Sequence, residues 1–110
     1  MYDIYLADNE EIQLIDDSVL INNEKIYTVI ITNYNLYILD MPSKIHNSNE
    51  DLRISGKINY IKKKEVIYKN SLSNISTITK DKITFNDNTH LTINSTSVIN
   101  KLSNILINSN

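Results

Sequence analysis

Short runs of β-branched and aromatic residues recur along this chain, and asparagine or aspartate, rather than glycine, separates them. The stretch TVIITNYNLYILD, from Thr28 to Asp40, holds two such runs around Asn33-Tyr34. Two runs joined by two residues predict a β-hairpin. Asparagine replaces glycine best where a tight turn needs a positive φ. Because the chain has one Gly in 110 residues, Asn and Asp are predicted to form nearly all turns of a mainly β protein.

A two-residue loop also fixes which residues of this hairpin share a face. With Asn33-Tyr34 as the loop, Ile31 lies opposite Leu36, and Val29 lies opposite Ile38. These four side chains then share one face and form a candidate core. The other face is mixed and consists of Thr28, Ile30, Tyr37 and Leu39.

The stretch KITFNDNTHLTIN, residues 82–94, predicts a second hairpin whose loop length is decided by burial of the apolar residues. A two-residue loop of Asp87-Asn88 scatters these residues over both faces. A three-residue loop of Asp87-Asn88-Thr89 brings them together and is the prediction, with Asn88 left-handed. The predicted pairs are Phe85 with Leu91 and Ile83 with Ile93.

The remaining segments also favour strands. IQLIDDSVLIN, from Ile12 to Asn22, fits a helix or a strand by periodicity. A strand is favoured because Val and Ile dominate, and Asn22-Asn23 is typical of a reversal into the next strand. EVIYKNSLSNISTITK, from Glu65 to Lys80, predicts two further short strands. PSKIHNSNED, from Pro42 to Asp51, is polar, contains the only proline and is predicted to be an exposed loop.

The period changes at the C-terminus, where STSVINKLSNILINSN has apolar residues at three- and four-residue spacing. This spacing predicts an amphipathic helix over residues 96–108, with Ser95 or Thr96 as its cap. Its apolar face consists of Val98, Ile99, Leu102, Ile105 and Leu106. The whole chain, residues 1–110, fits one domain, in which residues 1–11 form an N-terminal extension or an extra strand.

Several of these segments resemble those of bacterial pleckstrin-homology-like (PH-like) and GRAM domains. IITNYNLYIL, from Ile30 to Leu39, is similar to their first hairpin, and SLSNISTITK, from Ser71 to Lys80, is similar to a later strand. The second hairpin and the helix follow in the family's order, so the resemblance spans Ile12 to Ile107. Asn35 stands where the family commonly has Arg or Lys. The resemblance implies a strongly bent antiparallel barrel of about seven strands, closed by one C-terminal amphipathic α-helix.

Composition narrows the compartment and the chemistry. The chain has no cysteine, which excludes disulfides and thiolate zinc sites. Its N-terminus, MYDIYLADNEE, is acidic where a signal peptide is basic. No apolar run approaches the roughly 20 residues that span a bilayer. A cytoplasmic location is therefore predicted, with membrane association as an alternative.

No arrangement of residues predicts catalysis, a metal site or a cofactor. His46 and His90 lack an acidic or cysteine partner at motif spacing and are interpreted as surface residues. Asp16-Asp17 would point to opposite faces of a strand, which does not suit shared proton chemistry. The single glycine, Gly56, cannot form a phosphate-binding loop. The chain is therefore predicted to be non-enzymatic.

The charges are segregated along the chain. Residues 1–24 hold seven acids and no Lys or Arg, whereas six of the 11 basic residues lie between Arg53 and Lys69. Anionic phospholipid headgroups are candidate ligands for this basic strip, and a solvated protective face is the other interpretation. The members of the strip are Arg53, Lys57, Lys62, Lys63, Lys64 and Lys69. The net charge of −2 and the lack of a basic–aromatic platform argue against nucleic acid.

Tyrosines supply the other candidate site. Tyr34 and Tyr37 lie around the first hairpin, where exposed rings can form a protein-binding patch and half-buried rings can form part of the barrel wall. The leading prediction is a non-enzymatic PH-like adaptor for an unidentified protein partner. The alternative is peripheral binding to anionic membrane lipids through the basic strip. A homo-oligomer is compatible with both.

Overall fold

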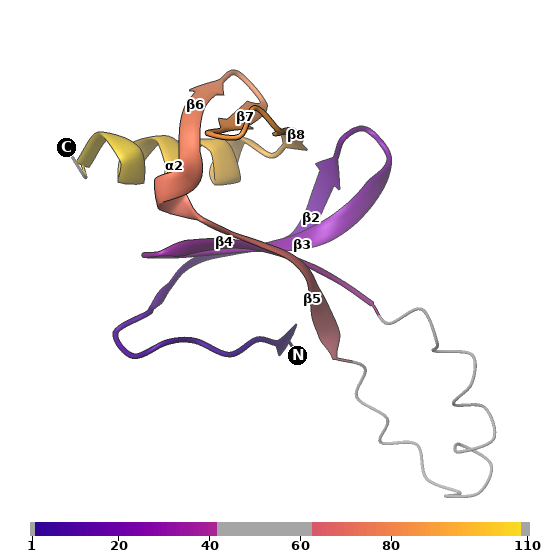
Figure 1. The fold of residues 1–110 in the computed structure, drawn as a ribbon. Helices are drawn as coiled ribbons and strands as arrows, with labels where there is room; N and C mark the ends of the chain where they lie inside the picture. Colours follow the sequence, from indigo (N-terminus) through magenta and orange to yellow (C-terminus); the bar gives the residue numbers. More distant parts are fainter. Residues whose placement is uncertain (1, 42–62, 109–110) are drawn as a thin grey trace, which may run out of the picture.

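A computed structural model describes residues 2–41 and 63–108 of the chain. One bent sheet of eight strands is followed by a helix, in the strand order β1-β5-β4-β3-β2-β8-β7-β6 (Figure 1). The strands are β1 (Tyr2–Asp3), β2 (Ile12–Ile21), β3 (Lys25–Thr32), β4 (Asn35–Asp40), β5 (Lys64–Ser71), β6 (Ile75–Thr79), β7 (Lys82–Phe85) and β8 (His90–Asn94). A short 3₁₀ helix, η2 (Leu72–Asn74), joins β5 to β6, and α2 (Thr96–Asn108) ends the fold. The predicted loop at Pro42–Asp51 lies outside the described residues.

This architecture confirms the predicted fold class, a mainly β protein with a bent antiparallel sheet and one C-terminal helix. Residues 1–11 were predicted to form an extension or an extra strand. They contribute the extra strand β1, since Tyr2–Asp3 pairs in parallel with the start of β5. The two end strands, β1 and β6, do not pair with each other within the described residues. The barrel is therefore not closed by strand pairing.

The β3–β4 hairpin has the predicted register. Val29 lies opposite Ile38, and Ile31 lies opposite Leu36. These four side chains are buried and belong to the main core cluster, so we call their side of the sheet the core face. The opposite side, here called the outer face, is also buried on this hairpin, although the prediction described it only as mixed. Its buried residues are Thr28, Ile30, Tyr37 and Leu39.

The turn at Asn33-Tyr34 is built differently from the prediction, because neither residue has a positive φ. Instead, the Thr32 hydroxyl accepts hydrogen bonds from the backbone N–H groups of Tyr34 (3.1 Å) and Asn35 (2.9 Å). The Asn33 side chain holds a neighbouring segment, since its Oδ1 accepts from the N–H of Glu11 (2.8 Å). Thr32, rather than a left-handed asparagine, therefore stabilises this turn.

Asparagine does hold a positive φ in other turns, as predicted. The reversal between β2 and β3 uses Asn22 (φ 54°) and Asn23 (φ 56°), which confirms the predicted turn and the strand that precedes it. Two successive left-handed residues suit the twist of a tight hairpin. The segment from Ile12 is therefore a strand that leads directly into β3.

The β7–β8 hairpin confirms the three-residue loop and the left-handed Asn88 (φ 71°), but the predicted loop position is wrong by one residue. The loop is Asn86–Asn88, because the N–H of Phe85 donates to the carbonyl of Thr89 (2.8 Å). The N–H of Asn88 donates to the carbonyl of Phe85 (2.9 Å). This loop places the left-handed residue third, after a type I turn, which is the preferred geometry for three residues.

The predicted pairs of this hairpin are wrong for the same reason. Ile83 pairs with Leu91, where Ile93 was predicted as its partner. The register differs by two positions, so each side chain keeps its predicted face. Ile83, Phe85 and Ile93 are accordingly all buried in the main core.

Helix α2 packs its apolar stripe on the core face. Its first turn is capped by Ser95, whose hydroxyl accepts from the N–H of Val98 (3.2 Å). Val98 and Leu102 are fully buried in the main core cluster. The partly buried residues that surround them are Ile99, Ile105 and Leu106. The helix therefore completes the core in the predicted way.

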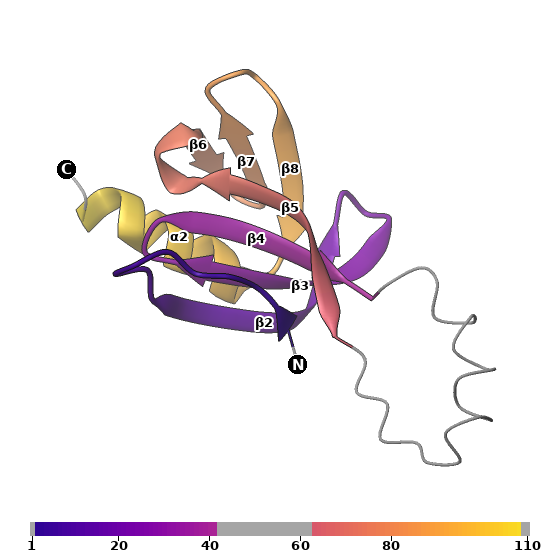
Figure 2. The ribbon, with the colours of Figure 1, turned by 60° about the horizontal axis from the view of Figure 1, so that its bottom comes forward.

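The N-terminal segment, residues 2–11, lies on the outer face, on the opposite side of β3 and β4 from α2 (Figure 2). Tyr2 and Ile4 pack against a second cluster made by Ile30, Tyr37 and Leu39. Both faces of the central hairpin are therefore covered, one by α2 and the other by this segment.

Candidate functional site

The predicted basic strip lies only partly within the described residues. Three members of the strip lie outside the described residues: Arg53, Lys57 and Lys62. His46 also lies outside them. Lys63 and Lys69 are exposed, and Lys64 is partly buried. Lys64 and Lys69 lie on β5, where Lys64 binds Asp17 and the ammonium group of Lys69 lies over the Tyr37 ring. The described part of the strip is thus not a patch of free ammonium groups.

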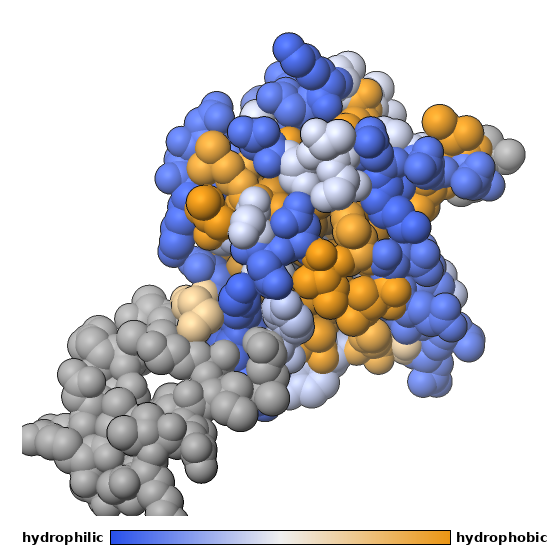
Figure 3. All heavy atoms as spheres, turned by 180° about the vertical axis from the view of Figure 1, so that it is seen from behind, coloured by the Kyte–Doolittle hydropathy of each residue, from blue (hydrophilic) through white to orange (hydrophobic). Residues whose placement is uncertain are grey.

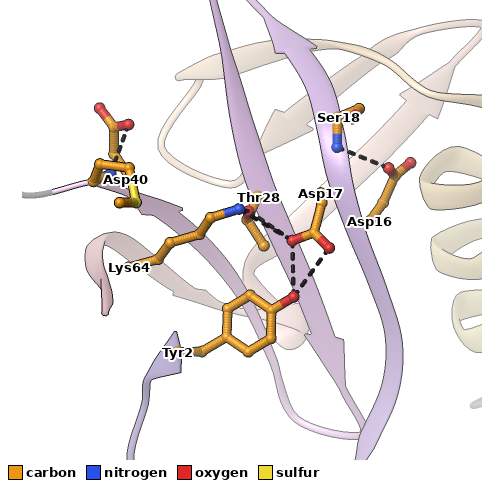
Figure 4. Close-up of polar contacts among 8 residues, drawn as sticks. Tyr2, Asp16, Asp17, Ser18, Thr28, Asp40 and Lys64 are labelled. Atoms are coloured by element: carbon orange, nitrogen blue, oxygen red, sulfur yellow. Dashed lines mark hydrogen bonds and ion pairs between the residues drawn. The ribbon is translucent and has the colours of Figure 1, made fainter. Parts of the chain in front are cut away.

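Lys64 belongs to a polar cluster on four strands (Figure 4). Its Nζ donates to the hydroxyl of Thr28 (2.7 Å) and to Oδ1 of Asp17 (3.2 Å). The same Asp17 oxygen accepts from the hydroxyls of Tyr2 (2.8 Å) and Thr28 (3.0 Å). The hydrogen bond from Tyr2, followed by those from Thr28 and Lys64, holds the pKa of Asp17 below its usual value despite partial burial. The cluster ties β1 and β5 to β2 and β3.

The neighbouring carboxylate, Asp16, turns to a different part of the molecule. Its Oδ2 accepts from the hydroxyls of Ser95 (2.7 Å) and Ser97 (3.2 Å), at the start of α2. The hydrogen bond from Ser95 is the main cause that lowers the pKa of Asp16. The two adjacent acids therefore bind separate partners and do not face one common proton.

A small pocket beside the Lys64 cluster has little room for a ligand. Its volume is about 90 Å³, and its lining includes Asp17, Asp40 and Lys64. Asp40 is itself paired with Lys25 at 2.5 Å. A space of this size holds about three waters, and its charged groups are already paired. The arrangement is structural in character.

A buried carboxylate joins the N-terminal segment to the first hairpin. Glu10 is 6% exposed, and its Oε2 accepts from Thr32 Oγ1 (2.6 Å), Tyr37 OH (2.7 Å) and Asn35 Nδ2 (2.9 Å). Its Oε1 accepts from the backbone N–H of Ala7 (2.9 Å). Burial alone would raise the pKa of Glu10, but these hydrogen bonds outweigh it and lower the pKa to about 2. The sequence contained no signal that singled out Glu10 among the N-terminal acids.

Tyr37, one of the two predicted protein-binding residues, is buried and not exposed. It is 2% exposed, so it cannot take part in a surface patch. Burial, and then the hydrogen bond to Glu10, raises the pKa of Tyr37 to about 12. Lys69 lies with its Nζ 5.6 Å from the centre of the Tyr37 ring, in a cation–π arrangement.

Tyr34, the other predicted residue, is 47% exposed at the rim of a groove. The groove measures about 340 Å³ and lies between the β3–β4 turn, η2 and the C-terminal turns of α2. We call it the end groove. Its lining residues are Asn33, Tyr34, Ser71, Leu72, Ser73, Ile105 and Leu106.

Local hydrogen bonds hold the walls of the end groove in place. The N–H of Leu72 donates to the carbonyl of Tyr34 (2.8 Å), which fixes η2 against the β3–β4 turn. The Ser71 hydroxyl accepts from the N–H of Ser73 (3.2 Å) and so caps η2. Sequence reasoning found Tyr34 but missed the others, because they come from three segments that meet only in the folded chain.

The chemistry of the end groove is apolar and uncharged. Leu72, Ile105 and Leu106 supply aliphatic surface, and hydroxyl and amide groups line the rest. None of the lining residues is an Asp, Glu, Lys, Arg or His. Such a site suits an uncharged segment with an apolar side chain, because burying an unpaired charge is costly.

The described residues contain no group of His, Asp or Glu side chains placed to hold a metal ion. His90, which begins β8, is exposed. Across residues 2–41 and 63–108, no helix has the length and apolar character needed to cross a membrane.

Comparisons with known proteins add no family assignment. The chain matches no protein-family model, no curated protein and no solved structure. The PH-like resemblance therefore stays a prediction.

Proposed function

We propose that the chain is a non-enzymatic, PH-like protein-interaction module and that the end groove binds an uncharged segment of a partner protein. The observation that carries this proposal is the groove itself, with aliphatic walls and the half-exposed Tyr34 at its rim. A bent antiparallel sheet followed by one helix agrees with the layout that the resemblance implies.

The size and composition of the groove support a peptide ligand. A volume of about 340 Å³ lies at the low end of ligand pockets, which run from roughly 300 to 1,000 Å³, and fits one or two side chains. Tyrosine is enriched in protein interfaces, and charged residues are depleted in their cores. We expect the partner to insert an aliphatic or aromatic side chain between Tyr34 and Leu106.

Binding to anionic membranes through the basic strip is the competing proposal. Lys63 and Lys69 are exposed, which supports it, but the ammonium group of Lys64 is paired with Asp17, and that of Lys69 lies over the Tyr37 ring. Vesicles of neutral and anionic phospholipid distinguish the two. Sedimentation with anionic vesicles that fades with salt and is lost in Lys62→Ala/Lys63→Ala/Lys64→Ala would favour the membrane.

Selection from a library of random displayed peptides tests the groove directly. We expect selected peptides to share an uncharged core with an aliphatic or aromatic residue, and Tyr34→Ala to weaken their binding by about tenfold. Tyr5→Ala is the matched control, because Tyr5 is 86% exposed and lies outside the groove. Failure to select any peptide, or equal losses in the two variants, would contradict the proposal.

A further inference from the structure

The first half of β2 has a strand partner on one side only. Residues Ile12 to Asp16 pair with β3, whereas pairing with β8 on the other side is confined to Leu20 and Ile21. Within the described residues, no strand pairs with Ile12–Asp17 on that side; we call this stretch the β2 edge. An edge of this kind presents backbone N–H and C=O groups that can pair with an added strand.

The side chains of the β2 edge are unusually apolar for an exposed strand. Ile12 is 42% exposed and Ile15 is 40% exposed. Ile15 lies opposite the fully buried Ile30, so an apolar row runs from the interior of the outer face to the border of the sheet. Figure 3 shows hydrophobic side chains gathered at the surface on one side of the molecule.

The unpaired border at β6, one of the end strands of the sheet, differs in this respect. Strand β6 pairs only with β7, and its exposed residues are Ser76, Thr77 and Thr79. Polar side chains of this kind offer little apolar surface to an added strand. The β2 and β6 borders thus have similar backbones but different side chains, and of these two the β2 edge has the stronger features of a docking site.

Charge decides what kind of strand the β2 edge can accept. Glu11, directly before it, is exposed, whereas the side chain of Asp17 at its end is 53% exposed but is paired with Lys64 at 3.2 Å. The N-terminal 24 residues carry seven acids and no Lys or Arg. A second copy paired about a two-fold axis would place Glu11 of one chain near Asp17 of the other, whose partner Lys64 is already engaged, so a second copy offers Glu11 no unpaired cation at that position.

We propose that the β2 edge accepts an extended strand from a different protein, with apolar residues at alternate positions and Lys or Arg at the end that lies beside Glu11. Backbone hydrogen bonds supply the pairing, Ile12 and Ile15 contact the apolar residues, and Glu11 attracts the basic end. Irregular pairing on both sides of Leu14–Asp16 makes the regular part of the edge short. The added strand is short for the same reason.

Synthetic octapeptides of alternating Val and Thr test this inference. One carries Lys at both ends, a second carries Glu, and a third repeats the Lys peptide with alternate amides N-methylated. By fluorescence anisotropy at low salt, we expect the Lys peptide to bind about tenfold tighter than the Glu peptide, a difference that shrinks as salt rises. The N-methylated peptide should lose binding, because it cannot complete the strand pairing.

Variants of the chain locate the binding. Ile12→Thr/Ile15→Thr should weaken the Lys peptide by about fivefold, and Glu11→Lys should remove its advantage over the Glu peptide. Ile107→Thr and Glu24→Lys are matched controls, because Ile107 is 69% exposed on α2 and Glu24 is exposed in the turn between β2 and β3. Tyr34→Ala, in the end groove, should leave this binding unchanged. Circular dichroism melting confirms that each variant is folded.

Three results would overturn the inference. The first is equal binding of the Lys and Glu peptides, and the second is equal weakening by the control and edge variants. The third is a sedimentation mass that doubles and returns to that of one chain in Ile12→Thr/Ile15→Thr, because the edge would then pair with a second copy. If the displayed library yielded no peptide that binds the end groove, the proposed function would fail but this inference about the β2 edge would still stand.

Discussion

On the core face, α2 buries Val98 and Leu102 against a cluster of aliphatic side chains, whereas on the outer face a buried carboxylate fixes the N-terminal segment. The first arrangement gains its free energy from removing apolar surface from water. The second depends on hydrogen bonds that must compensate the burial of a charge. The two faces of one hairpin thus depend on different interactions, which respond differently to substitution and to pH.

Truncation on the core face is expected to have the largest effect. Leu102 is fully buried in the main core cluster, so Leu102→Ala removes buried methyl groups and leaves a cavity. We expect the free energy of unfolding to fall by about 2–5 kcal/mol. Ile107→Ala, at a position 69% exposed on the same helix, is the control. Equal melting temperatures for Leu102→Ala and the unmodified chain would contradict the role of α2 in the core.

Acidification should weaken the attachment of the N-terminal segment on the outer face. The pKa of Glu10 is about 2 in the folded chain against an ordinary value of 4.5, so the unfolded chain takes up this proton first as the pH falls. The stabilisation is fully present above pH 4.5 and is lost as the pH falls toward 2. It amounts to about 3 kcal/mol.

Chemical denaturation at a series of pH values from 7 to 2 measures the stabilisation that ionised Glu10 contributes. Lowered pKa values of other acids, including Asp16 and Asp17, add losses of the same sign, so the comparison with Glu10→Gln isolates the Glu10 part. We expect the variant to lose less stability on acidification than the unmodified chain. If the free energies of unfolding of Glu10→Gln and the unmodified chain fell in parallel with pH, Glu10 would not supply this stabilisation.

At neutral pH, Glu10→Gln should destabilise the chain by about 1.5–3 kcal/mol, since a charged acceptor is lost from a buried network. The donors left with a weaker acceptor or with none are the Thr32 hydroxyl, the Tyr37 hydroxyl and the Asn35 amide. Glu11→Gln is the control, because Glu11 is exposed. Urea midpoints of the two variants that coincide would place Glu10 among ordinary surface acids.

The smallest effect is expected at the polar cluster of Figure 4. Tyr2→Phe removes the hydroxyl that donates to Asp17 but keeps the ring beside the outer-face cluster. Because this hydrogen bond is exposed, we expect a loss below about 1 kcal/mol. A loss as large as that of Glu10→Gln would mean that the attachment of β1, and not the buried carboxylate, controls the outer face.

The core face could be predicted because its signals are local. The alternation in Val29–Leu39 and the spacing of Val98 and Leu102 are visible within single elements, and both were confirmed. The position of the β7–β8 loop was wrong because the left-handed Asn88 must come third in the turn, a preference that outweighed the assumed pairing.

The outer face could not be predicted, because its contacts join distant segments. Glu10 and Tyr37 are 27 positions apart, and no periodicity links them. Tyr37 was therefore left between an exposed protein-binding patch and the barrel wall, whereas it is 2% exposed beside Glu10 and the N-terminal segment. The end groove was found only at Tyr34, since its other walls come from η2 and α2.

Amide hydrogen exchange of the unmodified chain and of Glu10→Gln tests the central claim that separate interactions secure the two faces. We expect the variant to lose protection first in β1 and in the Ala7 amide, which donates to Glu10, while the α2 amides around Leu102 stay protected. A uniform loss of protection across α2 and the N-terminal segment would contradict it.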